Sequence, residues 1–233
     1  MVVLAGCAFV VLHKPDSPAS TYVSHYKRPT ADATSAPVKP IAASDGRPQP
    51  VALVLGDSYS AGVGASTPAR GYVNLIGQQL GWKMIVESAP GGGYAKAGTN
   101  GKDLLQMYEA ADVKRLRPDV VIVQTGLNDV SVDDAKTRAA ATRLADSLHA
   151  DLSSTPVVVV GEFWPFPKQT PSSKARDATI GDVWTDRVNV LYLHPLSGWS
   201  DFHTTDDRHP DDAGHRMIAD HIIAALRRAG LLG

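Results

Sequence analysis

The segment VALVLGDSYS occupies residues 51–60, and it is the best starting point for predicting the fold. Its first residues are apolar and Gly56 ends the run, which is typical of a buried strand. Asp57, Ser58 and Ser60 follow at once, so polar side chains come directly after that strand. In open α/β sheets, sites form outside the carboxyl ends of the strands. The segment therefore predicts a buried strand that delivers a serine to a site.

Similar short apolar runs recur downstream, separated by stretches with helical periodicity. Strands that are apolar throughout and alternate with helices predict a parallel sheet covered on both faces. We therefore expect an α/β protein, a three-layer α/β/α sandwich with five parallel strands in the flavodoxin-like order 2-1-3-4-5. The expected strands are 51–55, 84–86, 120–124, 156–160 and 188–193, and the expected helices are 71–80, 102–115, 133–152 and 211–229.

Three more polar clusters follow predicted strands. They are Ser88 with the glycines 91–93, then Gly126-Leu127-Asn128-Asp129, and finally Asp206-Asp207-Arg208-His209-Pro210. Because the carboxyl ends of parallel strands meet at one edge of a sheet, we expect all four clusters to converge there.

These blocks resemble the SGNH (GDSL-type) hydrolase family. Gly56-Asp57-Ser58 is similar to its first block, the glycines 91–93 to its second, Gly126-x-Asn128-Asp129 to its third and Asp206-x-x-His209 to its fifth. The resemblance covers residues 51–233 and implies the SGNH hydrolase fold and a serine esterase, that is, a carboxylic ester hydrolase. One departure concerns the second block, which usually has an Asn a few residues before its glycine. This chain has Glu87 and Ser88 at the matching positions.

The residue types suit acyl transfer through a covalent intermediate. A serine hydroxyl such as that of Ser58 becomes a nucleophile when a base takes its proton. His209 is the candidate base, because imidazole titrates near neutral pH. Asp206, three residues earlier, is the candidate partner that fixes the imidazole tautomer, and Asp207 competes for that role. An α/β-hydrolase is disfavoured because Gly-x-Ser-x-Gly is not present here; Ser60 stands at its last position.

The resemblance also implies an oxyanion hole. Its donors would be the backbone N–H of Ser58, the backbone N–H of a glycine within 91–93 and the side-chain amide of Asn128. Gly92 is the first choice on spacing, but which glycine serves stays open. Asp57 and Asp129 are interpreted as structural residues that fix loop backbones.

Each of these residue types also occurs in ordinary structural roles. Ser58 could cap a helix, and His209 and Asn128 could be ordinary turn residues. Four histidines recur every six residues, yet His215 and His221 would point about 120° apart on a helix, so we expect no metal site. The segment 98–103 does not match a P-loop, and Gly62-x-Gly64 does not complete a dinucleotide motif. We therefore expect no cofactor.

The natural ester is not specified by the sequence. A small folded part with no obvious lid insertion favours small acyl groups on a glycan or another small-molecule ester. Trp164, Trp184 and Trp199 either line an acceptor groove or are partly buried in loops. Lysophospholipase, thioesterase and acyltransferase activities on the same triad stay open, as does a catalytically silent carbohydrate-binding module. The formal net charge of −1 and the mixed charges disfavour a nucleic-acid partner.

The N-terminal part differs in composition. Residues 2–12 are apolar, too short for a bilayer span of about 20 residues, and have no basic residues before them. We expect 1–12 to be the remnant of a signal anchor or export signal that tethers the protein to a membrane. A lipobox-like Leu4-Ala5-Gly6-Cys7 and a plain cytosolic start stay open. Residues 13–50, rich in Pro, Ala, Ser and Thr, are expected to be a linker before the catalytic domain at 51–233.

This organisation predicts an extracytoplasmic protein, secreted or anchored in a bacterial cell envelope. The chain has a single cysteine, Cys7, so no intramolecular disulfide can form. The sequence gives no indication of the oligomeric state.

Overall fold

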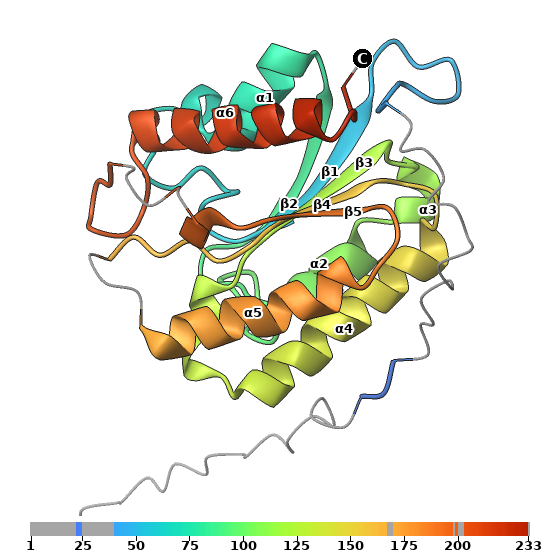
Figure 1. Cartoon of the computed structure of the whole chain (residues 1–233). Coiled ribbons are helices and arrows are strands. Elements are labelled where there is room, and N and C mark those ends of the chain that lie inside the picture. Colours follow the sequence, from blue (N-terminus) through green and yellow to red (C-terminus); the bar gives the residue numbers. More distant parts are fainter. Residues whose placement is uncertain (1–21, 25–39, 167–169, 198, 200–202, 233) are drawn as a thin grey trace, which may run out of the picture.

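The computed structural model describes residues 22–24, 40–166, 170–197, 199 and 203–232 (Figure 1). The expected apolar remnant at 1–12, with Cys7, and most of the expected linker lie outside the described residues. Among the helices that are described, none has the length and apolar character to cross a membrane.

The sheet has the predicted topology. In the described part of the chain, five strands pair in parallel in the order β2-β1-β3-β4-β5. The register places Gly56 opposite Ser88 and Gln124, and Gln124 opposite Val160, so the strands end level at one edge. The strands are β1 (Val51–Gly56), β2 (Lys83–Ser88), β3 (Val120–Gln124), β4 (Val157–Val160) and β5 (Val190–Leu193).

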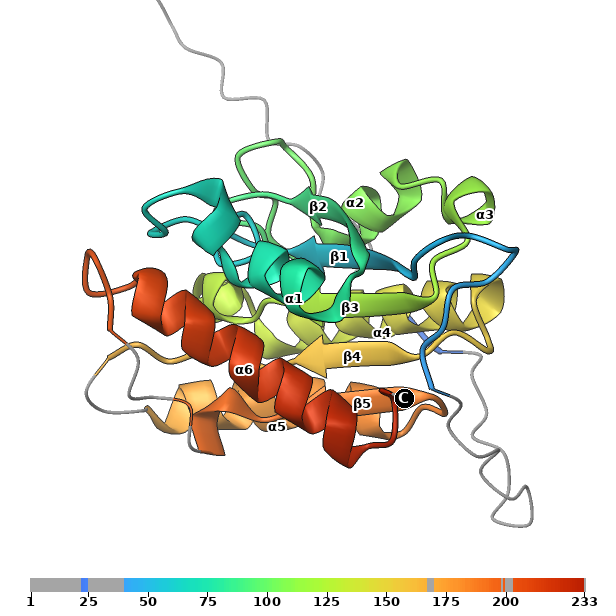
Figure 2. The ribbon, with the colours of Figure 1, turned by 90° about the horizontal axis from the view of Figure 1, so that it is seen from above.

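Helices cover both faces of the sheet, which completes the three layers (Figures 1 and 2). On one face lie α1 (Tyr72–Leu80) and α6 (Asp212–Arg228), packed against Ala52 and Val54 of β1. On the other face lie α2 (Leu104–Ala110), α4 (Asp134–Asp151) and α5 (Pro171–Thr185), packed against Leu53 and Leu55. Alternate residues of β1 thus face opposite layers, as a strand buried on both sides requires. The short helices are α3 (Val113–Leu116), η2 (Pro68–Arg70), η3 (Leu127–Ser131) and η4 (Pro195–Ser197).

Two helical segments differ from the prediction. The helix expected at 102–115 is divided into α2 and α3, because Asp112 adopts a positive φ of 46° between them. The sequence predicted no helix at α5, although Thr170 caps it and Pro171 opens it. Its inner face buries polar residues such as Ser173 and Arg176, so no apolar stripe marks it in the sequence.

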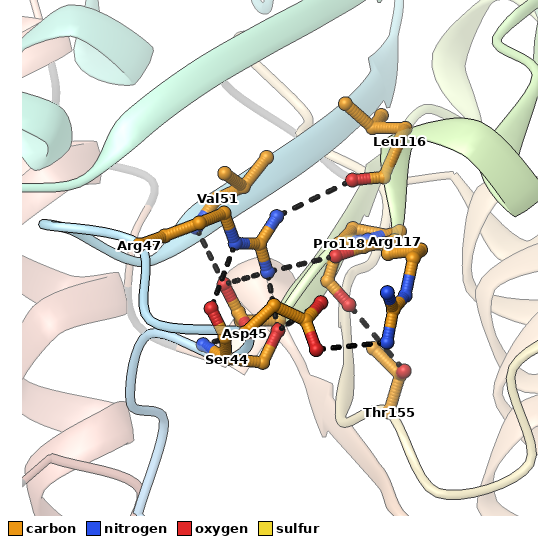
Figure 3. Close-up of polar contacts among 9 residues, drawn as sticks. Ser44, Asp45, Arg47, Val51, Leu116, Arg117, Pro118 and Thr155 are labelled. Carbon is orange, nitrogen blue, oxygen red and sulfur yellow. Dashed lines mark hydrogen bonds and ion pairs between the residues drawn. The ribbon is translucent and has the colours of Figure 1, made fainter.

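The residues just before β1 are fastened to the amino edge of the sheet (Figure 3). The Arg47 guanidinium lies 2.8 Å from the Asp119 carboxylate and donates to the carbonyls of Leu116 and Arg117. Asp119 also accepts hydrogen bonds from the N–H groups of Ser44 and Val51, at 3.1 and 2.8 Å. The ordered contacts therefore begin before residue 51, where the sequence placed the domain boundary. These contacts are polar, so apolar periodicity does not reveal them.

Candidate active site

A chain of hydrogen bonds joins the three predicted catalytic residues. The Ser58 hydroxyl oxygen lies 3.1 Å from Nε2 of His209, and Nδ1 of His209 lies 2.7 Å from Oδ2 of Asp206. Ser58 occupies the turn directly after β1, while the other two precede α6, where His209 lies 151 residues further along the chain. Ser58 does not cap a helix; its hydroxyl faces the imidazole. A nucleophile, a base and an orienting acid require this geometry.

The turn before α6 fixes Asp206 against the ring. Oδ1 of Asp206 accepts the backbone N–H groups of Arg208 and His209, at 3.1 and 2.7 Å. These hydrogen bonds, with the one from the ring, lower the pKa of the Asp206 carboxyl to about 2. Asp206 is thus ionised at neutral pH and accepts the Nδ1 proton, leaving Nε2 to face Ser58. Asp207, the competing acid, forms the corner of the turn with a φ of 61°.

Behind the serine, buried polar groups link the ends of β1, β2 and β3. Oδ2 of Asp57 accepts from the Thr125 hydroxyl at 3.3 Å and from the Asn128 amide at 3.4 Å. The Asn128 amide also donates to the carbonyl of Gly92 at 2.8 Å, and the single Thr125 hydroxyl proton is shared between Asp57 and that carbonyl, which lies 3.1 Å away. Asp57 therefore does more than fix its own turn, because it reaches the predicted oxyanion-hole amide. Sequence reasoning missed Thr125, although a polar residue at the end of a valine-rich strand was a signal.

The predicted oxyanion donors differ in what they already bind. Within the described residues, the N–H groups of Ser58 and Gly91 have no hydrogen-bond acceptor. The N–H of Gly92 donates to the carbonyl of Ala89 at 3.0 Å, and that of Gly93 donates to the carbonyl of Lys96 at 2.8 Å. The carbonyl of Gly92 thus contacts Asn128, while the N–H of Gly92 is bonded within its own loop.

Asp129 has the structural role that its sequence position suggested. Its carboxylate is fully buried and accepts the N–H groups of Tyr94, Ala95 and Lys96 at 2.8–3.1 Å. Burial raises the pKa of this carboxyl. A side chain at Gly93 would collide with the carboxylate, since a Cβ there would lie 2.5 Å from its oxygens. The glycine loop is therefore fixed to the loop after β3.

The three tryptophans considered for an acceptor groove have different places. Trp184 is not in a loop: it lies on α5, is 1% exposed and donates to the hydroxyl of Tyr94. Burial excludes it from a groove. Trp164 is 9% exposed and meets Phe166 edge to face, and the partly buried Trp199 stacks on His221.

The regularly spaced histidines point to different surroundings. His215 is fully buried, with its ring nitrogens near the backbone of Tyr72 and Val63. His221 lies against Trp199 with ring centroids 4.6 Å apart. Among the described residues, no three His, Cys, Asp or Glu side chains are grouped as metal ligands would be.

A parallel α/β sheet with a serine, a histidine and an acid at its carboxyl edge, and without Gly-x-Ser-x-Gly, defines a class of serine hydrolase. The chain belongs to the GDSL-like lipase/acylhydrolase family, whose pattern matches residues 54–217. No curated protein sequence is similar enough to be matched to the chain.

Solved structures share this fold at low sequence identity. A family two carbohydrate esterase from Cellvibrio japonicus is 22% identical, with a TM-score of 0.65, and the similarity covers 78% of this chain and 62% of that one. The salicylyl-acyltransferase SsfX3 from a tetracycline biosynthetic pathway is 20% identical, with a TM-score of 0.64 and coverages of 81% and 57%. TesA is 20% identical, with a TM-score of 0.63 and coverages of 77% and 99%. The chain thus spans only about three fifths of the first two structures.

Proposed function

We propose that the protein is a serine esterase that removes small acyl groups from O-acylated carbohydrate or another cell-envelope ester. The observation that carries the mechanism is the hydrogen-bonded series from the Ser58 hydroxyl through His209 to Asp206. The substrate class is supported by the similarity in fold to a carbohydrate esterase and by the absence of an obvious lid insertion in the sequence.

The reaction has two acyl-transfer steps. His209 takes the proton of the Ser58 hydroxyl as the oxygen attacks the ester carbonyl carbon. The tetrahedral intermediate collapses when His209 gives this proton to the leaving alcohol, and an acyl-serine forms. Water, deprotonated by the same imidazole, then attacks the acyl-serine. The imidazolium returns this proton to the Ser58 oxygen as the acyl–oxygen bond breaks, which releases the carboxylic acid and restores the serine hydroxyl. Asp206 stays ionised and stabilises the imidazolium in both steps.

The oxyanion that forms in each step needs donors already in place. The Ser58 N–H, which has no acceptor within the described residues, suits this role. The Asn128 amide donates to Gly92 at 2.8 Å and only over a long 3.4 Å contact to Asp57, so an oxyanion competes readily for this second proton. A glycine N–H of 91–93 completes the proposed set.

Hydrolysis of p-nitrophenyl acetate by the wild type and the Ser58→Ala variant tests the mechanism. We expect kcat to fall at least about a thousandfold, because the nucleophile is lost. A fluorophosphonate probe should label the wild type at Ser58, and labelling should fall sharply in His209→Ala. Ser172→Ala and His149→Ala are matched controls on α5 and α4, and both should react like the wild type. Equal hydrolysis rates for Ser58→Ala and the wild type would disprove the serine mechanism.

The substrate is tested by a chain-length series of acyl esters alongside acetylated and succinylated glycans. We expect acetyl and other short acyl esters to have the highest kcat/KM. An acyltransferase is the second candidate, supported by the similarity in fold to SsfX3. Formation of an acylated alcohol in preference to free acid, when an acceptor alcohol is added, would favour that candidate.

We also propose an extracytoplasmic location with a membrane tether through the N-terminus. This proposal is supported by the apolar residues 2–12 and the proline-rich segment that follows. Protease treatment of intact bacterial spheroplasts that express the full chain with a C-terminal tag tests it. An extracytoplasmic enzyme loses the tag, whereas a cytosolic one keeps it until the spheroplasts are lysed.

A further inference from the structure

The loop 61–66 follows the turn that carries Ser58 and leads through η2 to helix α1. The N–H of Val63 donates to the carbonyl of Ser58 at 2.9 Å, which ties the loop to the backbone of the serine. The loop also lies against the turn of the base. A Cβ at Gly64 would lie 2.2 Å from the carbonyl oxygen of Pro210 and 3.2 Å from Cβ of His209. The loop therefore fills the space between the two halves of the site.

His215 holds this loop from the other side. It lies on the first turns of α6, shortly after His209, and is fully buried. Its Nε2 lies 3.1 Å from the carbonyl oxygen of Val63, and its Nδ1 lies 3.3 Å from the backbone nitrogen of Tyr72. Since Nδ1 must accept the Tyr72 proton, Nε2 carries the ring proton and donates it to Val63. The tautomer of the neutral ring is thus fixed by two backbone groups.

The surroundings keep this ring neutral. Tyr72 is the first residue of α1, whose N–H groups form the positive end of the helix and have no intrahelical acceptor. Burial, the strongest influence, lowers the pKa of His215, and the nearby His209 acts in the same direction, while the Val63 carbonyl, Asp212 and Asp211 oppose them. A protonated ring would turn a second N–H toward the Tyr72 N–H and lose that bond.

We propose that His215 is a positioning residue for the catalytic pair, an inference that rests on the proposed function. The peptide groups of Val63 form the link: its N–H holds the Ser58 carbonyl, and its C=O is held by His215. Because α6 starts directly after the turn of His209, this link connects the nucleophile to the element that carries the base. His215 thereby sets the distance between the Ser58 hydroxyl and Nε2 of His209.

Two amide substitutions separate the contacts of His215. His215→Gln places its amide near the position of Nε2, so it can still donate to Val63. His215→Asn places its amide near Nδ1, so it can accept from Tyr72 but does not reach Val63. We expect kcat on p-nitrophenyl acetate to stay within about twofold of wild type for Gln and to fall about 10- to 100-fold for Asn, as small misplacements in a site do. KM should change little, and the rate of fluorophosphonate labelling should follow kcat.

Gln79→Ala is the matched control, because Gln79 joins α1 to Asp220 of α6 at 3.3 Å without contacting the loop. It should leave kcat unchanged. Circular dichroism shows whether each variant folds. If His215→Asn does not fold, His215→Phe supplies an apolar ring of similar shape that lacks both hydrogen bonds, and it should show the same loss of kcat.

The outcomes distinguish the two proposals. A folded His215→Asn or His215→Phe variant with wild-type kcat and labelling rate overturns the positioning role, provided that Ser58→Ala is inactive. Equal losses in Gln and Asn also overturn it, because the Val63 contact would then be irrelevant. Wild-type activity in Ser58→Ala overturns the proposed function itself, and the positioning role with it.

Discussion

Asp57 is a buried acid whose ionised form is destabilised by loss of solvation. Its side chain is 2% exposed, and burial raises its pKa to about 6 even though the Tyr59 N–H and the side chains of Gln124 and Thr125 donate to it. The carboxylate form is retained at neutral pH because these donors, with the Asn128 amide, need an acceptor. Burying this charge lowers the stability of the fold, but the hydrogen bonds that Asp57 accepts hold three strand ends together next to the site.

This burial predicts a pH dependence of stability. Because the pKa of Asp57 is raised from 3.8 to about 6 on folding, the folded state takes up a proton between these values that the unfolded state does not bind. The wild type should therefore gain stability relative to Asp57→Asn as the pH falls from 7 to 4. The gain should be at most about 3 kcal/mol, the free energy that corresponds to this change in pKa.

Urea unfolding of both proteins at several pH values measures this difference. Asp182→Asn is the control, because the Asp182 side chain is 72% exposed and its difference from wild type should not follow the Asp57 titration. A constant difference between wild type and Asp57→Asn from pH 7 to pH 4 would contradict the prediction.

Much of the site could be predicted from the sequence because its residues lie at the ends of predicted strands. Ser58 and His209 follow buried segments whose topology is fixed by the apolar pattern, so their meeting follows from the fold. The oxyanion glycine was not predictable in the same way. Local backbone angles, such as the φ of 78° at Gly91, decide which N–H in the segment 91–93 is left without an acceptor. Three consecutive glycines do not indicate these angles in the sequence.

At the scale of elements, α5 shows where apolar patterning fails. The strands and the amphipathic helices were predicted because their apolar residues repeat with the right period. Helix α5 instead turns Arg176 and Asp177 toward the interior, where Arg176 meets a buried acid. Such a helix is indicated by its cap, Thr170 followed by Pro171, rather than by a stripe.

The partner of Arg176 is Glu162, which follows β4. Their side chains are 2% and 0% exposed, and two nitrogen–oxygen contacts of 3.1 and 3.0 Å join them. Arg176→Met should destabilise the fold by about 3–5 kcal/mol, because it leaves the Glu162 carboxylate buried and unpaired. The double variant with Glu162→Gln should recover part of this loss. Urea unfolding measures both.

An exposed ion pair provides the comparison for this buried one. Arg138 and Asp182 lie 3.4 Å apart with side chains 49% and 72% exposed, so Arg138→Ala should change stability by less than about 1 kcal/mol.

The double variant at Glu162 and Arg176 separates two causes of the destabilisation. If it were no more stable than Arg176→Met, the loss of stability would come from lost packing rather than from the unpaired charge of Glu162.

At the scale of the whole molecule, the candidate catalytic residues and the contacts of the N-terminal segment lie at opposite edges of the sheet. The candidate catalytic residues lie at the carboxyl ends of the strands, whereas the polar contacts of Ser44 and Arg47 lie at the amino ends, where β1 begins (Figure 3). Tyr22 and Ser24 also contact the body, since both hydroxyls donate to Asp146 of α4, at 2.7 and 2.9 Å. Segments predicted as linker thus contact surfaces away from the site.

This separation predicts different results for two truncations. A chain that starts at residue 40 keeps the contacts of Arg47 with Asp119, whereas one that starts at residue 51 loses them. Asp119, only 5% exposed, would then have no guanidinium partner, and we expect a loss of about 1–3 kcal/mol in the free energy of unfolding. Because the site is at the opposite edge, kcat should be the same for both chains well below their unfolding temperatures.

Urea unfolding and p-nitrophenyl acetate hydrolysis together test this boundary. Arg117→Ala in the longer chain is the control. Its pair with Asp45 has side chains 64% and 39% exposed, so its removal should cost less than about 1 kcal/mol. Equal urea midpoints for the two truncations would place the start of the stable domain at residue 51, as the apolar pattern predicted. A lower midpoint for the shorter chain, with kcat unchanged, would show that residues 40–50 stabilise the domain without shaping its site.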